Sequence, residues 1–386
     1  MSDSHTIEIS ALAHGGAGIG RIEGQVVFVP GTVPGDTVRV AVTKRTKNAL
    51  FGELQEIVTA SPDRATPPCP NFGRCGGCTW SHVAYPAQAT WKQDIVRQSL
   101  RRLAGADVEV GWVEDASLRL GYRTRAELHG DGKHLGFFQP GSHTILQSTE
   151  CPTCHPNLNT AWQALMPLGI KGTVTVTVNP EGEEVLVWTQ FVKRKLNDRF
   201  PLTNTPNDPE RHQFLFDGIP IVNGTFSQAS LLLNRLLQRE TRKAIGKADS
   251  LLDLYCGNGN LSLPSADSMR VVGADHNRAA IRAARNAGRG DYRTGGEEIM
   301  KKLLVQEPWD VILLDPPRTG AKELAPAMAK ADARAIVYVS CDPATLARDI
   351  KTLEQGGWQP MSVTAVDLFP NTPHVETVCR LERVSG

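Results

Sequence analysis

The sequence predicts an α/β protein in which a doubly wound parallel sheet follows a small β-barrel and a region of mixed strands. After Phe226, short apolar runs typical of buried strands alternate with helical stretches, which indicates a parallel sheet covered on both faces. Residues 6–58 instead alternate short apolar runs with glycine-rich turns, which favours about five strands of a barrel. A chain of 386 residues is long for one core. We therefore expect a barrel at 1–60, a mixed central region at 61–225 and the parallel sheet at 226–386.

The composition argues against several classes of protein. No run of about 18 apolar residues occurs, so we expect no membrane-spanning helix. The first residues lack the basic and apolar segments of a secretory signal, which favours a cytoplasmic protein. The eight cysteines are then expected to be metal ligands or catalytic thiols rather than disulfides.

The formal net charge of +1 gives no general attraction to a polyanion. A nucleic-acid surface would have to come from local basic patches, and such patches are usually only solvated surface. The candidates are Lys44, Arg45 and Lys47, and Lys193, Arg194 and Lys195.

Between the barrel and the parallel sheet, the pattern is less regular. Residues 61–70 are rich in proline and serine, which is typical of a linker. Apolar residues spaced among polar ones predict a helix at 87–103. Two apolar runs that flank residues 179–184 predict a hairpin with its turn there.

The C-terminal region opens with an amphipathic helix at 227–245. Buried strands are predicted at 251–256, 271–276, 310–317 and 335–342. Residues 361–384 read as two further strands with no helix between them. At least one of these two strands should therefore be antiparallel to the sheet.

A ligand site is indicated where the first of these strands ends. Residues 253–263 combine a strand, a glycine-rich turn and a helix start, so free backbone amides would face a ligand. Asp275 follows at the end of the next strand, where an acid can bind ribose hydroxyls. An adenosine-containing ligand explains both features, although a plain Rossmann-type turn with an incidental acid does so nearly as well. The run Gly257-Asn258-Gly259-Asn260 lacks the third glycine of the dinucleotide pattern and is more similar to the first motif of S-adenosylmethionine methyltransferases.

Three polar residues stand at strand ends where open α/β sheets bind ligands. Asp315 ends one strand and Cys341 ends the next, while Glu376 opens the last strand. Each is weak evidence alone, because such cysteines are usually structural and such carboxylates are usually solvated or paired. Arg318 follows the Asp-Pro-Pro sequence where amine methyltransferases carry an aromatic residue, which argues against amine methylation.

Together these motifs resemble the RNA uracil-5-methyltransferase family, most closely its iron–sulfur, 23S rRNA-type members. Residues 15–40 resemble the TRAM RNA-binding barrel, an OB-like fold, and the motifs FSQAS, DLYCGNGN, LLDPPRTG, VYVSCDPATLARD and HVETV follow in the family's order. The resemblance implies a Rossmann-like methyltransferase domain, S-adenosylmethionine as methyl donor and RNA as partner. It favours 23S rRNA, with a tRNA T-loop uridine as the alternative, and we expect a monomer.

The resemblance also implies roles for individual residues. Cys341 would be the nucleophile that adds to carbon 6 of uracil, and Glu376 the base that removes the carbon 5 proton. The positions that match cofactor contacts are Gln228, Tyr255, Asn260, Asp275 and Asp315. Asp342 departs from the family's usual Asn and could raise the pKa of Cys341. Gly295 stands where an Asn commonly contacts the cofactor.

A set of cysteines resembles the family's cluster ligands, namely Cys69, Cys75, Cys78 and Cys151. Four thiols suit either a [4Fe–4S] cluster or structural zinc. The spacing alone favours zinc, because Cys75-x2-Cys78 and Cys151-x2-Cys154 together look like a zinc ribbon. The Cys69-x5-Cys75-x2-Cys78 spacing together with the resemblance instead favours [4Fe–4S] with Cys154 as a spare, in a folding or RNA-shaping role. A radical methylthiotransferase is disfavoured because its C-x3-C-x2-C run is missing.

Two rival functions remain at this point. The barrel and the cysteines could hold RNA in a non-catalytic binding protein with a degenerate methyltransferase domain. The intact Cys341, Glu376 and glycine loop argue against that alternative. A DNA cytosine-5 methyltransferase would carry its nucleophile in a Pro-Cys pair after the fourth strand, whereas Cys341 follows Ser340 after the fifth.

Overall fold

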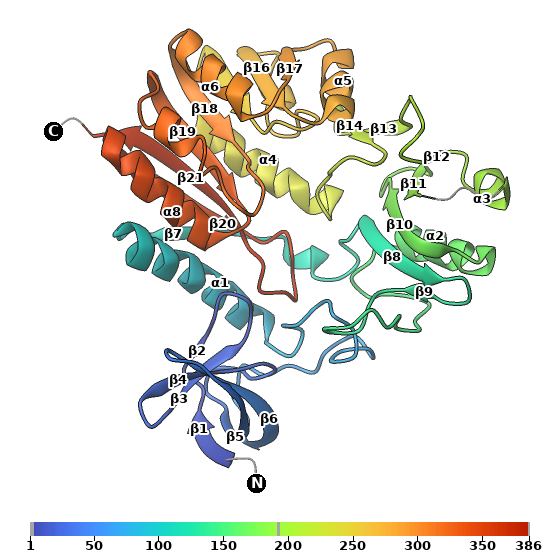
Figure 1. The fold of residues 1–386 in the computed structure, drawn as a ribbon, viewed down its shortest axis with the longest axis vertical. Coiled ribbons are helices and arrows are strands. Elements are labelled where there is room, and N and C mark those ends of the chain that lie inside the picture. The colour runs from blue at the N-terminus through green and yellow to red at the C-terminus, as the bar shows by residue number, and fades with distance from the viewer. Residues whose placement is uncertain (1–3, 191–193, 385–386) are drawn as a thin grey trace.

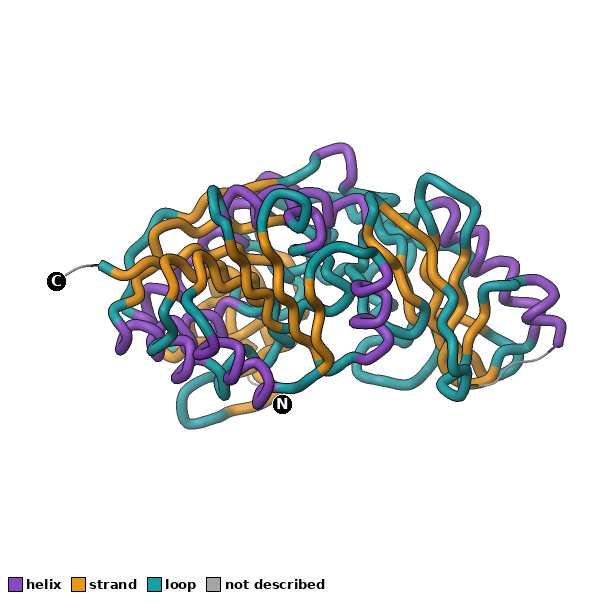
Figure 2. Tube along the Cα trace, turned by 90° about the horizontal axis from the view of Figure 1, so that it is seen from above, coloured by secondary structure: helices purple, strands orange, loops and turns teal. Residues whose placement is uncertain are grey.

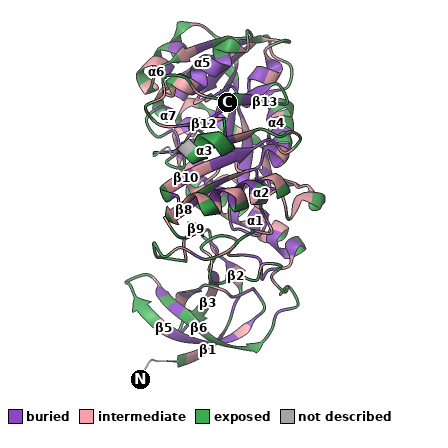
Figure 3. Cartoon of the chain, turned by 90° about the vertical axis from the view of Figure 1, so that its right-hand side faces the viewer, coloured by how far each residue is buried: buried purple, intermediate pink, exposed green. Residues whose placement is uncertain are grey.

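The computed structural model describes residues 4–190 and 194–384, and it shows three regions arranged around one central junction (Figure 1). The N-terminal barrel lies at one end of the molecule, below both other regions (Figure 3). Lys193, from the second basic patch, lies outside the described residues. Within the described ranges, no helix is both long enough and apolar enough to cross a membrane.

The barrel region is one curled sheet of six strands rather than about five. Its order is β1-β5-β6-β4-β3-β2, and β2 is too short to be recognised in the sequence. Alternate side chains such as Val27, Val38 and Val40 are fully buried inside it. The strands are β1 (Ser4–Glu8), β2 (Ala11–Leu12), β3 (Gly18–Ile22), β4 (Gln25–Val29), β5 (Thr37–Arg45) and β6 (Leu50–Thr59).

The proline-rich stretch after the barrel is fastened to it rather than being a free linker. The Arg64 guanidinium donates to both carboxylate oxygens of the buried Asp36, at 2.8 and 2.7 Å. Trp80 and Val83 then pack with Leu12 of the barrel in a small apolar cluster. The barrel is therefore docked onto the chain that follows it.

The predicted helix after the cysteines is present as α1 (Tyr85–Ser99), which continues as a π-helical turn at Leu100–Ala104. It is followed by β7 (Val110–Val113), which pairs in parallel with β20 (Trp358–Val366). The sequence pattern assigns these elements to the central region, but they belong physically to the C-terminal sheet. The reason is hydrophobic burial, because Val96 and Leu100 share one core with that sheet.

The central region is a five-stranded sheet of order β12-β11-β10-β8-β9 with α2 packed on β10. The pairing of Val178 with Val185 confirms the predicted hairpin turn at 179–184. A separate hairpin, β13 with β14, leads on to the C-terminal sheet. The elements are β8 (Arg125–Asp131), β9 (Leu135–Gly136), α2 (Pro156–Leu165), β10 (Lys171–Val178), β11 (Val185–Thr189), α3 (Arg194–Arg199), β12 (Thr203–Asn204), β13 (Gln213–Phe216) and β14 (Ile219–Val222).

The C-terminal sheet has eight strands in the order β17-β16-β15-β18-β19-β21-β20-β7. The strands from β17 to β19 are parallel, whereas β21 is antiparallel to both of its neighbours, as the sequence predicted. The elements are α4 (Leu231–Ile245), β15 (Ser250–Leu254), β16 (Arg270–Asp275), α5 (Arg278–Asn286), β17 (Asp291–Thr294), α6 (Glu297–Gln306), β18 (Trp309–Leu314), α7 (Ala325–Met328), β19 (Ala333–Ser340), α8 (Pro343–Leu353) and β21 (Glu376–Arg383).

Helices cover both faces of this sheet (Figure 2). Along β15, Leu252 and Leu254 enter the core beneath α6 and α8, whereas Leu251 enters the core beneath α4 and α5. This alternation follows from the period of two in a strand. Both faces are therefore apolar, and polar function is left to the strand ends.

Candidate active site

The site lies where the direction of winding reverses. From β15 the chain proceeds to β16 and β17 on one side, and from β18 to β19 on the other. Adjacent strand ends therefore carry loops that diverge, and such switch points bind ligands in open α/β sheets. Tyr255 follows β15 and Asp315 follows β18, and the Asp315 amide reaches the Leu254 carbonyl at 3.4 Å.

The loop after β15 is held in a tight conformation. Tyr255 adopts a left-handed φ of 59°, and Gly257 and Gly259 have φ of 55° and 80°. A Cβ on Gly259 would collide with Leu263, so this glycine is required. A 3₁₀ turn at Leu263–Ser265 follows instead of the predicted α-helix.

Asp275 ties this loop to the neighbouring strand. One carboxylate oxygen accepts from the Gly257 amide at 3.0 Å, and the other accepts from the Asn277 amide at 2.7 Å. The side chain is nearly buried at the end of β16. These contacts show that Asp275 shapes the glycine loop, and its ribose-binding role stays a prediction.

Two of the other expected cofactor contacts, Tyr255 and Asn260, lie in the same loop. The Tyr255 hydroxyl donates to Glu297 at 3.0 Å, which holds its half-buried ring at the loop's edge. Asn260 exchanges two hydrogen bonds with Asn234 of α4, at 2.7 and 3.0 Å. That contact fixes the end of the glycine loop against α4. Gln228 is buried in the segment just before α4.

Strand register places the two predicted catalytic residues at one edge. Ser340 pairs with Thr377 across β19 and β21. Cys341 follows Ser340 and Glu376 precedes Thr377, so both lie at the same end of adjacent antiparallel strands. Asp315 directly follows β18, the neighbour of β19 on the other side.

The charges of these residues act on one another strongly. Burial, together with the negative charges of Glu376 and Asp315, raises the pKa of Cys341 to about 12. Burial and the charge of Asp315 raise the pKa of Glu376 well above its usual value, and burial also raises the pKa of Asp315. The exposed Arg318 opposes the shifts at Cys341 and Glu376. The free site therefore favours a neutral Cys341 thiol.

Sequence comparison identifies the family of this chain. Residues 5–55 match the TRAM domain, and residues 301–384 match the tRNA (Uracil-5-)-methyltransferase family model. A 23S rRNA (uracil(1939)-C(5))-methyltransferase RlmD of Vibrio campbellii is 31% identical, with 98% of this chain and 95% of that protein covered. An uncharacterized RNA methyltransferase of Gloeobacter violaceus is 33% identical, with 98% and 96% covered. The chain belongs to the RNA uracil-5-methyltransferase family.

The fold is also found in a solved structure. The tRNA (uracil-54, C5)-methyltransferase of Pyrococcus abyssi, in complex with S-adenosyl-L-homocysteine, aligns with a TM-score of 0.77 at 23% identity. The alignment covers 98% of this chain and all of that one. The N-terminal barrel and the methyltransferase sheet are thus parts of a shared architecture, as the sequence predicted.

The two departures from the family pattern have structural explanations. Asp342 is the N-cap of α8, and its Oδ1 atom accepts from the amides of Ala344 and Thr345. Burial, Glu376 and Asp315 are the largest causes that raise the pKa of Cys341, so the expected effect of Asp342 is not the main one. A Cβ at Gly295 would collide with Ile299, so a larger residue there would displace α6.

Sequence analysis missed one acid. Asp253 lies inside β15 and is fully buried, and burial with the charges of Asp315 and Asp275 raises its pKa to about 8. An aspartate inside an otherwise apolar strand run was the available signal.

The predicted cluster ligands lie in one neighbourhood but not around one point. The charges of Cys151 and Cys69 both act on Cys75, and the Cys78 and Cys151 thiols both contact the Thr153 hydroxyl. However, within residues 4–190 and 194–384 no three His, Cys, Asp or Glu side chains are arranged as ligands of a single metal ion. The four thiols suit an iron–sulfur cluster in their chemistry.

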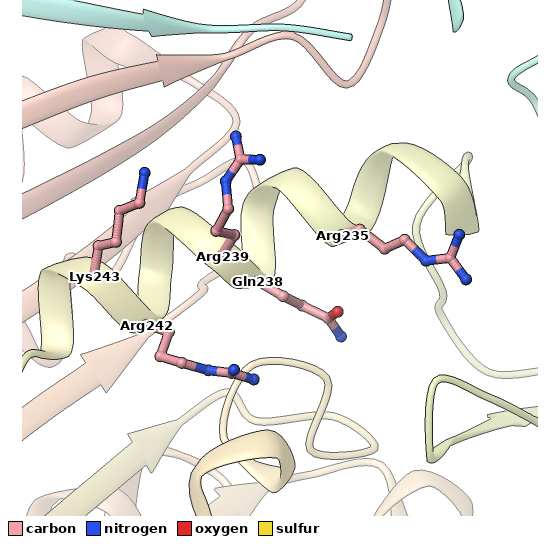
Figure 4. A pocket seen from close by; sticks show the side chains of 5 residues that line it. All are labelled: Arg235, Gln238, Arg239, Arg242 and Lys243. Atoms are coloured by element: carbon pink, nitrogen blue, oxygen red, sulfur yellow. The ribbon is translucent and has the colours of Figure 1, made fainter.

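A shallow groove runs along α4, lined by Arg235, Gln238, Arg239, Arg242 and Lys243 (Figure 4). Several of its cations are already paired, because Arg239 and Lys243 both bond to Glu240 and Arg235 bonds to Asp217. Only Gln238 reaches the glycine loop, through Asn260. None of the predicted catalytic residues lines this groove.

Proposed function

We propose that this protein transfers the methyl group of S-adenosylmethionine to carbon 5 of a uridine in RNA through a covalent bond to Cys341. The observation that carries the proposal is the position of Cys341 and Glu376 at one end of adjacent strands, beside Asp315 and the glycine loop. We further propose 23S rRNA as substrate and a monomer acting in the cytoplasm. The RlmD name of several relatives supports the rRNA substrate.

The chemistry assigns each residue one task. The Cys341 thiolate forms a bond to carbon 6, and the electrons of the carbon 5–carbon 6 double bond move to give an enolate. Carbon 5 of that enolate then forms a bond to the methyl carbon while the methyl–sulfur bond of S-adenosylmethionine breaks, and the sulfur keeps the electron pair, which gives S-adenosylhomocysteine. The Glu376 carboxylate removes the proton from carbon 5, the double bond forms again, and the thiolate leaves. Asp315 orients the uracil edge or the cofactor beside both groups.

The raised pKa values make this chemistry dependent on bound substrate. A thiol with a pKa of about 12 is almost wholly neutral in the free site. A bound methyl sulfonium carries a positive charge, which would favour both the thiolate and the two carboxylates. Activation would therefore follow cofactor binding, which protects the thiolate until the methyl donor is in place.

The experiment uses RNA with 5-fluorouridine at the target, since fluorine cannot leave as a cation. Wild type should form an RNA–protein adduct that survives a denaturing gel, and Cys341→Ala should form none while still binding RNA and cofactor. On ordinary RNA, Glu376→Gln should methylate the ring and then stall as the adduct. Turnover by Cys341→Ala, or no adduct with wild type, would refute the covalent mechanism.

The choice of RNA requires a separate measurement. Mass mapping of 5-methyluridine in rRNA and tRNA from a deletion strain should show the loss in 23S rRNA. Loss of the modification from the tRNA T-loop instead would support the alternative substrate and leave the chemistry unchanged.

We also propose that Cys69, Cys75, Cys78 and Cys151 hold a [4Fe–4S] cluster, which rests on the family resemblance of their spacing. Such a cluster takes four thiolates, so the cysteine segment would have to close around it. It takes no part in the methyl transfer and would order the segment between the barrel and α1.

A further inference from the structure

Glu376, the proposed general base, is the first residue after the loop of a β-hairpin. Strands β20 and β21 are antiparallel, and their last pair before the loop is Val366 with Glu376. The loop therefore comprises residues 367–375, and any movement of its ends moves Glu376. Val366 also pairs with Val113 of β7, and the Asp367 amide donates to the Val113 carbonyl at 2.9 Å.

A buried ion pair anchors the first residue of this loop. The Lys92 ammonium donates to Oδ1 of Asp367 at 2.8 Å, and the exposed fractions of the two side chains are 0% and 1%. The Tyr85 hydroxyl donates to Oδ2 of the same carboxylate at 2.6 Å. Lys92 also donates to the Phe369 carbonyl at 3.0 Å. Two residues of α1 thus hold both the start of the loop and a residue further along it.

Hydrogen bonds with α1 and with Trp80 and Tyr122 hold the later residues of the loop. The Asn371 amide donates to the Gln88 side chain of α1 at 2.9 Å, and the Trp80 amide donates to the Asn371 carbonyl at 3.0 Å. Asn371 has a left-handed φ of 67°, a conformation that persists where its surroundings fix it. The Tyr122 hydroxyl donates to the Pro370 carbonyl at 3.2 Å.

Burying the Lys92 ammonium costs hydration free energy, so its presence at this position indicates a specific role. Burial lowers the pKa of Lys92, and the charge of Asp367 opposes that change. A buried ion pair is seldom more stabilising than an apolar pair of similar volume, because both ions lose their hydration. Directional bonds to a carboxylate and a carbonyl do, however, fix a loop in one position, and an apolar contact does not.

We propose that Lys92 and Asp367 are positioning residues that hold Glu376 opposite the carbon 5 proton of the uracil bound to Cys341. This proposal rests on the proposed function, because it assumes that Glu376 is the base. A base must lie within hydrogen-bond reach of the proton that it removes, and a displacement of about 1 Å can slow a step by about 100-fold. The step that depends on Glu376 is release of the adduct, whereas adduct formation depends on Cys341.

The test compares these two steps in single turnover on ordinary RNA. Lys92→Met alone leaves Asp367 buried without its ion partner and is expected to fold poorly. The double variant Lys92→Met/Asp367→Asn removes both charges and keeps the Tyr85 contact possible. We expect it to bind S-adenosylmethionine normally and to form the adduct within about threefold of the wild-type rate. Release of the adduct should slow by about tenfold or more.

The matched control is Arg97→Met, which also removes a cation and an ion pair from α1 but on its exposed side. It should change neither step. Glu376→Gln is run in parallel and should stall completely. If Glu376→Gln stalls but the double variant releases product at the wild-type rate, or if both of its steps slow equally, the positioning role is wrong. If Glu376→Gln itself does not stall, the proposed base is wrong and the inference falls with it.

Discussion

The Nε2 atom of His14 lies 3.3 Å from the Oδ2 atom of Asp342, so a side chain of the barrel meets the residue that follows Cys341. The loop that carries His14 is docked nearby, because the Trp80 indole donates to the Gly16 carbonyl at 3.0 Å. A Cβ on Gly16 would crowd both Trp80 and Pro373, a residue of the loop that leads to Glu376. The barrel thus contacts the residue next to Cys341 and packs close to the loop that leads to Glu376.

The two oxygens of Asp342 have separate partners, which gives the first prediction. Oδ1 caps α8 and Oδ2 faces His14. Asp342→Asn keeps the capping oxygen, so the free energy of unfolding should change little. Asp342→Ala loses the cap and should lower it by about 1 kcal/mol. Urea unfolding of both variants checks this, and equal losses would show that the cap contributes nothing.

The basic patch of the barrel gives the second prediction. Lys44, Arg45 and Lys47 are all exposed at the end of β5 and just after it. If they contact RNA phosphates, replacing all three by Gln should flatten the salt dependence of RNA binding by up to about one unit per lost contact. Filter binding across a range of salt concentrations measures the slope. Lys301→Gln/Lys302→Gln on α6 is the control. An unaltered slope in the triple variant would show that the basic patch does not contact RNA phosphates.

Charge substitution is a better test of the barrel than its removal. Deleting residues 1–60 would leave Arg64 without Asp36 and would expose Trp80, which is fully buried against the barrel. The remaining chain would then carry a new apolar surface, so weak RNA binding could reflect damage to the fold.

The cysteines give the third prediction. Protein purified without oxygen should contain iron and absorb light broadly at roughly 400 nm. Cys69→Ser should lose the iron, whereas Cys154→Ser should keep it, because Cys154 is buried in the central core. Iron and zinc analysis of the three proteins checks both statements. Stoichiometric zinc without iron in wild type would reject the cluster.

The alternation of strands and helices, and the polar residues at the strand ends, could be predicted because they depend on local patterns. Asp315 and Cys341 follow apolar runs, and parallel strands place such ends at one edge. The antiparallel return of β21 was also predictable, since no helix separates it from β20. That return brings Glu376 next to Cys341.

The sequence could not indicate contacts that join distant segments. Lysine side chains are normally exposed, whereas Lys92 is buried on the inner face of α1 beside Asp367, which lies 275 residues away. The four residues of β7 carry no signal that they pair with β20. His14 meets Asp342 only because the barrel docks beside the loop at 367–375. These contacts depend on how regions pack rather than on local propensity.

The fourth prediction concerns stability and pH. Burial and Asp315 raise the pKa of Glu376 in the folded protein, so the folded state binds a proton that the unfolded state has already released. Folding stability should therefore fall as pH rises from about 4.3, the pKa of an unfolded glutamate, up to the folded pKa. Glu376→Gln removes this titration, so its advantage over wild type should be absent near pH 4 and should grow toward pH 8. Each tenfold difference in proton affinity between the folded and unfolded states corresponds to about 1.4 kcal/mol. Urea unfolding across this range measures it, with Glu382→Gln on the same strand as control, and a constant difference between Glu376→Gln and wild type would show that Glu376 ionises freely.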